Sequence, residues 1–191
     1  MSRVVVSEFV SLDGVMEHPG GAEGFEHGGW TFQFDQGDDG GKFKLDELFA
    51  ADALLLGRVT YQGFAAAWPT MEGAGEFGEK MNSMRKYVVS GTLADDDATW
   101  NNTRVIRGDL GTEIAKLKAE PGGDLLVAGS AQLARSLTCL GLVDELRLMV
   151  FPIVLGSGKR LFSDVTGTPK FTLVEAKTSG AGVLLLTYHS A

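Results

Sequence analysis

The sequence predicts an α/β fold with a mainly parallel sheet, helices on both faces and an antiparallel hairpin at the end of the chain. Short apolar runs alternate with segments of helical periodicity, the pattern of right-handed βαβ units. The last two apolar runs are separated by the glycine-rich turn "TSGAG", which predicts the hairpin. No repeat and no shift in composition divides the 191 residues, so we expect one domain over residues 1–191.

The expected strands are short apolar runs. The leucines at positions 54–56 are apolar without alternation, which is typical of a strand buried on both faces of a sheet. The run at 144–156 is expected to end as a strand at Pro152, because proline has no N–H to donate to a neighbouring strand. Strands are expected at residues 3–10, 53–57, 86–93, 103–108 and 124–129, within the run 144–156 as far as Pro152, and in the hairpin at 170–177 and 183–190.

The expected helices carry apolar stripes and end signals. Leu110, Ile114 and Leu117 recur at the spacing of one helix face. Thr60 and Ser130 follow predicted strands directly, so we expect each to cap the helix that it opens. Helices are expected at residues 42–52, 60–68, 110–118 and 130–141, with a short helix near 77–84.

Composition excludes several classes of protein. The net charge is −8 and no basic cluster is present, which argues against binding of nucleic acid. The chain has one cysteine, Cys139, so it forms no internal disulfide; we expect Cys139 to be a buried core residue and the protein to be cytoplasmic. The N-terminal apolar run is too short for a signal peptide and is interrupted by Glu8, and no run is long enough to span a membrane.

Residues 11–41 form a long segment that is rich in glycine and acidic residues and lacks a clear period. A loop of that length in a compact domain is usually functional or partly disordered. It contains His18 and His27, but neither these nor His189 has the spacing of metal ligands. We therefore expect no metal ion.

The ends of the predicted strands are the places to look for a ligand site, since open α/β sheets bind ligands at the carboxyl ends of their strands. Gly57, Gly91 and Gly129 lie there and allow a ligand to approach the backbone closely. Two helices also start at this edge, and the first N–H groups of a helix attract anions. Arg58 adds a permanent positive charge, so the edge is expected to bind phosphates.

Turn formation and capping explain glycine, serine and threonine in any one of these loops equally well. The binding interpretation depends on their coincidence along one edge. No G-x-G-x-x-G opens a helix directly after a predicted strand, as the dinucleotide fingerprint requires, and the sequence suggests neither a G-x-S-x-G elbow nor a hydrolase triad.

Several motifs resemble a known family. "SEFVSLDGVME", "LLLGRVTYQGF", "KYVVSGTL" and the long run from "DLLVAGSAQLA" to "VLGSGKRLF" are similar, in order, to the dihydrofolate-reductase-like superfamily. The likeness is greatest to the reductase domain of the bifunctional deaminase-reductases of riboflavin biosynthesis. A zinc deaminase motif needs more than one cysteine, so the chain resembles a stand-alone reductase domain. The resemblance implies a three-layer dihydrofolate-reductase-like fold.

The resemblance also implies the cofactor NADPH and hydride transfer to a small heterocycle, such as 5-amino-6-(5-phosphoribosylamino)uracil. The implied cofactor-binding residues are Gly57, Arg58, Thr60, Ser90, Gly91, Thr92, Gly129, Ser130, Ala131, Gln132 and Leu133. The implied substrate-binding residues are Leu12, Gly14, Val15, Pro152 and Leu155. Asp13 is the candidate catalytic group at the reacting end, although a plain turn residue in Leu-Asp-Gly explains it equally well.

Three alternatives stay open. The first is an enzyme like dihydrofolate or pterin reductases; these place a carboxylate at the start of the helix before "GRVT", and Asp38, Asp39, Asp46 and Glu47 do not match that position cleanly. The second is a nucleotide-binding protein without turnover, and the third is a structural subunit that pairs through its sheet edge and keeps only a vestigial site. We also expect a homodimer, as is common among similar reductase domains, because the closing hairpin is apolar and residues 146–156 look exposed.

Overall fold

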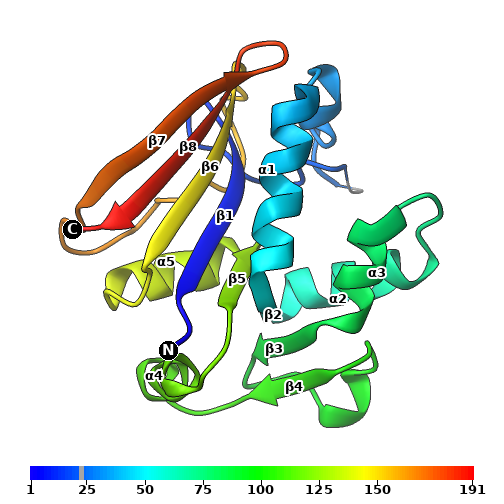
Figure 1. Cartoon of the computed structure of the whole chain (residues 1–191), viewed down its shortest axis with the longest axis vertical. Coiled ribbons are helices and arrows are strands. Elements are labelled where there is room, and N and C mark those ends of the chain that lie inside the picture. Colours follow the sequence, from blue (N-terminus) through cyan, green and yellow to red (C-terminus); the bar gives the residue numbers. More distant parts are fainter. Residues whose placement is uncertain (22–23) are drawn as a thin grey trace.

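A computed structural model describes residues 1–21 and 24–191 of the chain (Figure 1). The strands are β1 (Val4–Ser11), β2 (Ala51–Gly57), β3 (Arg85–Val89), β4 (Thr103–Ile106), β5 (Asp124–Ala128), β6 (Glu145–Phe151), β7 (Phe171–Ser179) and β8 (Val183–Ser190). The α-helices are α1 (Gly37–Ala50), α2 (Arg58–Ala67), α3 (Gly75–Ser83), α4 (Leu110–Ala119) and α5 (Ala131–Cys139). Short 3₁₀ turns are formed by Trp30–Gln33, Trp68–Thr70 and Asp95–Asp97.

The described strands form one eight-stranded sheet in the order β4-β3-β2-β5-β1-β6-β8-β7. Strands β1 to β6 run parallel to one another, whereas β8 pairs antiparallel with β6 and with β7. The prediction of a mainly parallel sheet with an antiparallel C-terminal hairpin is therefore confirmed. β1 lies between β5 and β6, so the first strand of the chain occupies the middle of the sheet.

Helices cover both faces of the sheet (Figure 1). Leu55 of β2 packs in the cluster that contains the buried side chains of α4 and α5. Its neighbours Leu54 and Leu56 point the other way and pack in the cluster that contains residues of α1, α2 and α3. Alternate residues of a strand face opposite sides, which is why an unbroken leucine run is needed at a strand covered by helices on both faces.

A third apolar cluster covers one face of the hairpin half of the sheet. Trp30 is fully buried there, and its ring packs edge-on against that of Phe151 with 5.3 Å between the ring centroids. The Nε1 of Trp30 donates a hydrogen bond to the carbonyl of Glu17 over 2.9 Å. The same cluster includes Phe25 and Phe34. Part of the segment expected to be a long loop thus packs on the sheet.

Helix α1 begins at Gly37, five residues before the expected start. Its first turn lies against the hairpin: the N–H of Gly40 donates to Ser179 Oγ over 3.0 Å, and a Cβ on Gly40 would lie 3.3 Å from Met149 Cε. Glycine allows this close approach, but its low helix propensity conceals the start of the helix.

Two further expectations are wrong. The residues of β6 within 146–156 do not form an exposed face, because each of them is buried or partly buried. Cys139 is exposed at the end of α5, off the buried stripe formed by Leu133 and Leu137. Among the described helices, none combines the length and the apolar character needed to cross a bilayer.

Candidate active site

The carboxyl ends of five neighbouring strands carry most of the residues predicted for the site. In the order of the sheet, these ends are Ser90 after β3, Gly57 in β2, Gly129 after β5, Leu12 after β1 and Pro152 after β6. The five strands run parallel, so their carboxyl ends lie along one edge. The predicted cofactor loops of β2 and β5 are adjacent, and β1 separates them from the predicted substrate loop of β6.

The loops after β2 and β5 are joined directly by hydrogen bonds. The N–H of Gly57 donates to Ser130 Oγ over 3.0 Å, and Thr60 Oγ1 donates to the carbonyl of Gly129 over 2.9 Å. Gly129 has φ +66°, and a Cβ there would lie 3.1 Å from Thr60 Cγ2. Both the backbone conformation and the contact with Thr60 require glycine at this position.

Thr60 and Ser130 do not cap their helices as the sequence predicts. Helix α2 begins at Arg58, so Thr60 lies within its first turn. Ser130 is at the N-cap position of α5, but its hydroxyl is bonded to Gly57 and to the carbonyl of Ala128. Within the described chain, no side chain caps the start of α2 or of α5. The first-turn N–H groups of these adjacent helices are therefore not taken by a side-chain cap.

Arg58 is the first residue of α2 and is exposed. Its Nη1 donates to Gln62 Oε1, one turn along the helix, over 3.1 Å. Ser90 closes its own turn by accepting N–H groups of Thr92 and Leu93 at 3.1 and 3.0 Å.

The remaining predicted cofactor residues differ in exposure. Gly91, Thr92 and Gln132 are exposed and Ala131 is partly buried, whereas Leu133 lies in the core and can offer a ligand only its backbone.

The predicted substrate residues lie on two loops that are also bonded together. The N–H of Leu12 donates to the carbonyl of Ile153 over 2.8 Å, and Asp13 accepts the N–H groups of Leu155 and Gly156 at 3.1 and 2.9 Å. The Leu12 side chain is 61% exposed, and Pro152 is exposed as well.

Two further residues of the predicted substrate set adjoin the same bonded loops. Gly14 has φ +78°, and its carbonyl accepts a hydrogen bond from the N–H of Leu161. Val15 is fully buried and forms an isolated antiparallel β-bridge with Arg160.

Asp13 is a carboxylate surrounded by donors. The Ser11 hydroxyl donates to Oδ1 over 2.7 Å, and this bond, with the N–H groups of Leu155 and Gly156, lowers the pKa of Asp13 to about 2. Arg160 lies 3.4 Å from Oδ2. Asp13 is consequently ionised at neutral pH and acts there as an acceptor, not as a donor of protons.

Glu8 is a residue of this region that the sequence analysis missed. It lies in the middle of β1 and is 4% exposed, and its Oε2 accepts the N–H of Gly129 over 2.8 Å. Its Oε1 is buried and has no partner among the residues that the structure describes. Burial raises the pKa of Glu8 to about 8. The available signal was an acidic residue inside an otherwise apolar strand.

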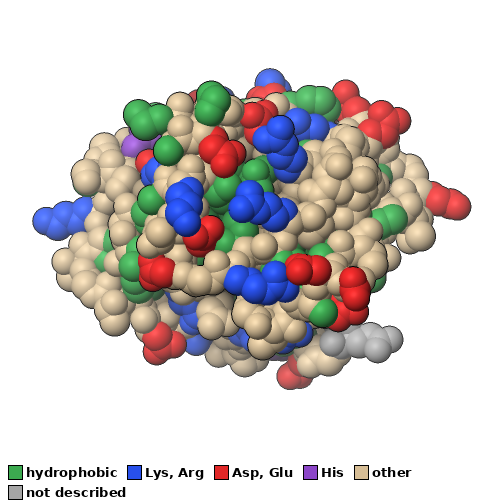
Figure 2. Space-filling view, turned by 90° about the horizontal axis from the view of Figure 1, so that it is seen from below, with side chains coloured by type: hydrophobic (Ala, Val, Ile, Leu, Met, Phe, Trp, Pro, Cys, Tyr) green, Lys and Arg blue, Asp and Glu red, His purple; other side chains and the backbone are tan. Residues whose placement is uncertain are grey.

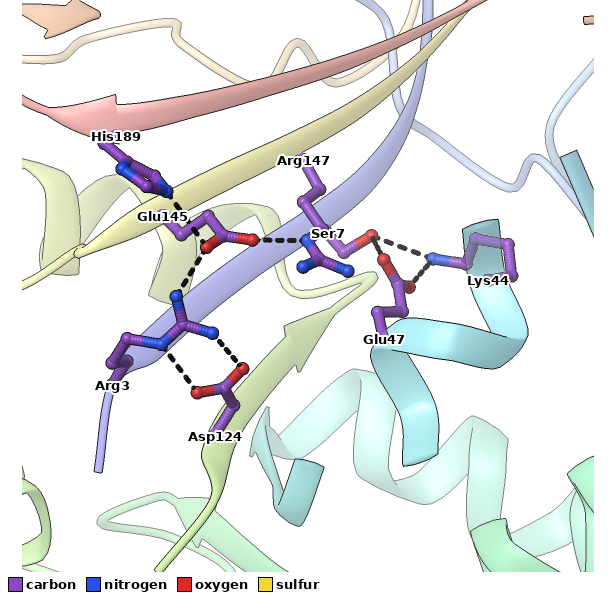
Figure 3. Close-up of polar contacts among 8 residues, drawn as sticks. All are labelled: Arg3, Ser7, Lys44, Glu47, Asp124, Glu145, Arg147 and His189. Carbon is purple, nitrogen blue, oxygen red and sulfur yellow. Dashed lines mark hydrogen bonds and ion pairs between the residues drawn. The ribbon is translucent and has the colours of Figure 1, made fainter. Parts of the chain in front are cut away.

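A second polar cluster lies between α1 and the sheet (Figure 3). Ser7 Oγ donates to Glu47 Oε2 over 2.7 Å, and Lys44 Nζ donates to Ser7 Oγ over 2.9 Å and pairs with Glu47. Nζ of Lys44 also lies 5.0 Å from the ring centroid of Phe9. These buried charges neutralise one another, which is the usual condition for charges inside a protein.

The cluster continues to the amino ends of the central strands. Arg3 holds Asp124 with two hydrogen bonds of 2.9 and 2.6 Å and donates to Glu145 over 2.7 Å. The buried Glu145 also pairs with Arg147, and His189 Nε2 lies 3.3 Å from its Oε2 (Figure 3). Figure 2, which views the molecule from below, shows Lys and Arg side chains interspersed with Asp and Glu. The ion pairs of Arg3 with Asp124 and Glu145 indicate a role in stability.

Two shallow hollows of about 560 and 590 Å³ lie away from the predicted residues. Asp52 and Arg85 line the first, at the amino ends of β2 and β3, opposite to the edge at which parallel sheets bind ligands. Among the residues that the structure describes, no group of three or more His, Cys, Asp or Glu side chains lies close enough together to hold a metal ion.

Comparison with known proteins gives the family. The model of the RibD C-terminal domain matches residues 2–185. The chain is 32% identical over 190 residues to the uncharacterized protein YyaP of Bacillus subtilis (strain 168), covering 98% of this chain and 94% of YyaP. It is 29% identical over 184 residues to YwjB of the same organism, covering 96% of this chain and 95% of YwjB.

Solved structures share the fold. A putative riboflavin biosynthesis protein from Shewanella sp. PV-4 superposes with a TM-score of 0.79 at 20% identity, covering 100% of this chain and 99% of that one. The chain also superposes, with a TM-score of 0.60 at 17% identity, on a diaminohydroxyphosphoribosylaminopyrimidine deaminase/5-amino-6-(5-phosphoribosylamino)uracil reductase from Thermotoga maritima. This match covers 100% of this chain and 57% of that one. With the family match over nearly its whole length, the chain belongs to the RibD C-terminal domain family.

Proposed function

We propose that the protein is an NADPH-dependent reductase that transfers a hydride to a small heterocyclic substrate, most like 5-amino-6-(5-phosphoribosylamino)uracil. The observation that carries this proposal is the bonded junction between Gly57–Thr60 and Gly129–Ser130, which holds two uncapped helix starts side by side. Membership of the RibD C-terminal domain family supports the reaction class. The printed name of the Thermotoga maritima neighbour suggests the substrate class.

The residues at this junction fit the phosphates of a dinucleotide. Backbone N–H groups at helix starts are donors for an anion, and the helix dipole favours negative charge there. Arg58 supplies a permanent positive charge beside the start of α2, and we assign it to the ribose 2′-phosphate of NADPH. The diphosphate would be held by first-turn N–H groups of α2 and α5. Gly91 and Thr92 would lie at the adenosine end.

The substrate end is assigned to the bonded loops after β1 and β6. A reduced nicotinamide supplies the hydride when it is bound. Asp13 fixes one loop against the other and is ionised, so its part is to hold the backbone and to accept a hydrogen bond from a substrate N–H. Leu12 and Pro152 offer apolar contact area to a flat ring. The protein thus contributes positioning and exclusion of water.

We propose further that residues 1–191 form one domain that acts in the cytoplasm as a homodimer, without a metal ion. The apolar side chains of Leu173, Val174 and Leu184 in the hairpin are 52, 54 and 38% exposed, which supports pairing with a second copy of the chain. The proposed partners are therefore NADPH, the heterocyclic substrate and this second copy, with no nucleic acid and no membrane.

A turnover experiment tests the proposal. The loss of the reduced nicotinamide absorbance is followed with the ribosylaminouracil, with dihydrofolate and with no substrate. Rapid loss with the uracil alone is the expected result. Turnover of dihydrofolate alone would favour the pterin reductase alternative, and NADPH binding without turnover of either substrate would favour a nucleotide-binding protein. Absence of NADPH binding would overturn the proposal.

A further inference from the structure

Glu8 is a buried carboxyl that contacts the loop proposed to hold the cofactor. It lies in β1, beside β5, and the Gly129–Ser130 turn leads from β5 into α5. Its Oε2 accepts the N–H of Gly129 over 2.8 Å, and the N–H of Ser130 also stabilises its charged form. The carboxyl group of Glu8 therefore lies directly before the first-turn N–H groups of α5 that are proposed to bind a phosphate.

The second oxygen of Glu8 is not satisfied. Oε1 is buried and lacks a hydrogen-bond partner within the described part of the chain. A buried polar atom without a partner is rare in native proteins and calls for an explanation, such as a ligand. In a neutral carboxyl, Oε1 would carry the proton, because Oε2 already accepts from Gly129.

The charged groups around Glu8 both lie on α1, and the other polar contacts come from the Gly129–Ser130 turn. Burial is the largest effect and raises the pKa of Glu8 to about 8. The N–H groups of Gly129 and Ser130 and the positive charge of Lys44 on α1 lower the pKa of Glu8. The negative charge of Glu47 on the same helix raises it. Lys44 is already paired with Glu47, so it leaves the carboxyl largely neutral at neutral pH.

We propose that Glu8 is a proton-controlled positioning residue of the phosphate site. The neutral carboxyl holds the Gly129–Ser130 turn in place through Oε2 and puts no negative charge behind the start of α5, so that a diphosphate can bind there. The ionised carboxylate repels the same diphosphate. Binding above the pKa therefore takes one proton from solvent onto Glu8. This inference rests on the proposed cofactor site and adds a control of it by pH.

Titration calorimetry over a range of pH tests the inference. NADPH and inorganic pyrophosphate are each titrated into the wild-type protein, Glu8→Gln and the control Glu175→Gln, an exposed carboxylate of β7. Glutamine keeps an acceptor for Gly129 and cannot ionise. Two buffers with different heats of ionisation give the number of protons taken up on binding.

The wild-type protein and the control are expected to bind both anions about tenfold more weakly at about pH 9 than at about pH 7, with uptake approaching one proton. The affinity of Glu8→Gln is expected to change little over the same range. Equal pH dependence in the wild-type protein and in Glu8→Gln would overturn the inference. So would failure of both anions to bind at any pH.

The two proposals fail separately in this design. Pyrophosphate that binds with the expected pH dependence, while NADPH does not bind, supports the role of Glu8 and overturns the proposed cofactor. If Glu8→Gln does not fold, the proton count on the wild-type protein decides alone. No proton uptake on binding at about pH 9 would then contradict the inference.

Discussion

The side chain of Ser130 accepts a hydrogen bond from the backbone N–H of Gly57 over 3.0 Å, although the two residues lie 73 positions apart in the chain. This bond joins the ends of the adjacent strands β2 and β5, and with them the starts of α2 and α5. Two helix starts held together make a stronger anion site than either start alone, because both dipoles act on the same charge.

Arg58→Ala should weaken NADPH binding by about ten- to a hundredfold and leave NADH nearly unchanged. Charge-assisted hydrogen bonds to a phosphate are worth about 1.5–3 kcal/mol each, and NADH lacks the 2′-phosphate. Dissociation constants from fluorescence titration measure the effect, with Arg104→Ala on β4 as a matched control. Equal losses of affinity for both cofactors would indicate that Arg58 contacts the diphosphate instead. No loss of affinity for either cofactor would exclude Arg58 from the site.

Asp13→Asn should lower kcat/KM about tenfold while the dissociation constant of NADPH stays within about twofold. The carboxylate of Asp13 accepts hydrogen bonds from the hydroxyl of Ser11 and from the N–H groups of Leu155 and Gly156. Asparagine has only one acceptor oxygen and cannot accept all of them. Steady-state kinetics and a binding titration on the same samples give both values. Normal kcat/KM would leave Asp13 as a turn residue.

The same residue gives a pH prediction. Its folded-state pKa is lowered to about 2, so its contribution to stability is present above the ordinary pKa and is lost as the pH falls toward about 2. The wild-type protein should therefore lose more stability than Asp13→Asn on acidification below about pH 4. Denaturant unfolding at several acid pH values measures the difference, and parallel curves for the two proteins would refute it.

Glu8 should make the free energy of unfolding fall as the pH rises from about 5 to about 8. Its folded-state pKa is raised to about 8, so the folded protein keeps a proton that the unfolded chain has released. The fall should be about 3 kcal/mol larger in the wild-type protein than in Glu8→Gln. The comparison uses the change in the free energy of unfolding with pH, because the substitution itself shifts the stability of Glu8→Gln by the same amount at every pH. Urea unfolding without added ligand gives both curves, and identical slopes would show that Glu8 is not buried in a neutral form.

Arg3→Ala should lower the free energy of unfolding by about 2 kcal/mol without changing cofactor binding. It would leave Asp124 and Glu145 without their shared guanidinium. Breaking a buried pair costs about 3–5 kcal/mol, and we expect less because the Arg3 side chain is 47% exposed. Chemical denaturation measures the loss, with Arg104→Ala as the control. A change in NADPH affinity would instead connect this network to the site.

The protein should be a homodimer at micromolar concentration. Light scattering should give twice the chain mass of 20.3 kDa. Changing the exposed Leu173 and Val174 of β7 to lysine should produce monomers, because charges on an apolar contact oppose its burial. A monomer mass for the wild-type protein would contradict the prediction.

The ends of the parallel strands could be predicted from the sequence. Most of the apolar runs stop at a glycine or a serine, and in a parallel sheet these ends share one edge. This pattern predicts Gly57 and Gly129 on that edge, whereas only the family resemblance predicts Leu12 there. The start of α1 was not predictable, because its glycines have low helix propensity and are held by Ser179, 139 positions later.

The details of the site depend on contacts between distant residues. Thr60 and Ser130 looked like caps, since their positions after a strand are typical of caps, but each hydroxyl bonds the opposite loop instead. Glu8 stood out only as an acid that interrupts an apolar run. Its importance depends on Gly129, 121 positions away, and no local pattern signals such a contact.

The most direct test of the account is a crystal structure of the protein with NADPH. The diphosphate is expected within hydrogen-bond distance of the first-turn N–H groups of α2 and α5, with the 2′-phosphate beside Arg58 and the nicotinamide toward the end of β1. NADPH bound anywhere else, such as in the hollow lined by Asp52 and Arg85, would contradict the account. So would crystals grown at saturating NADPH that contain no bound cofactor.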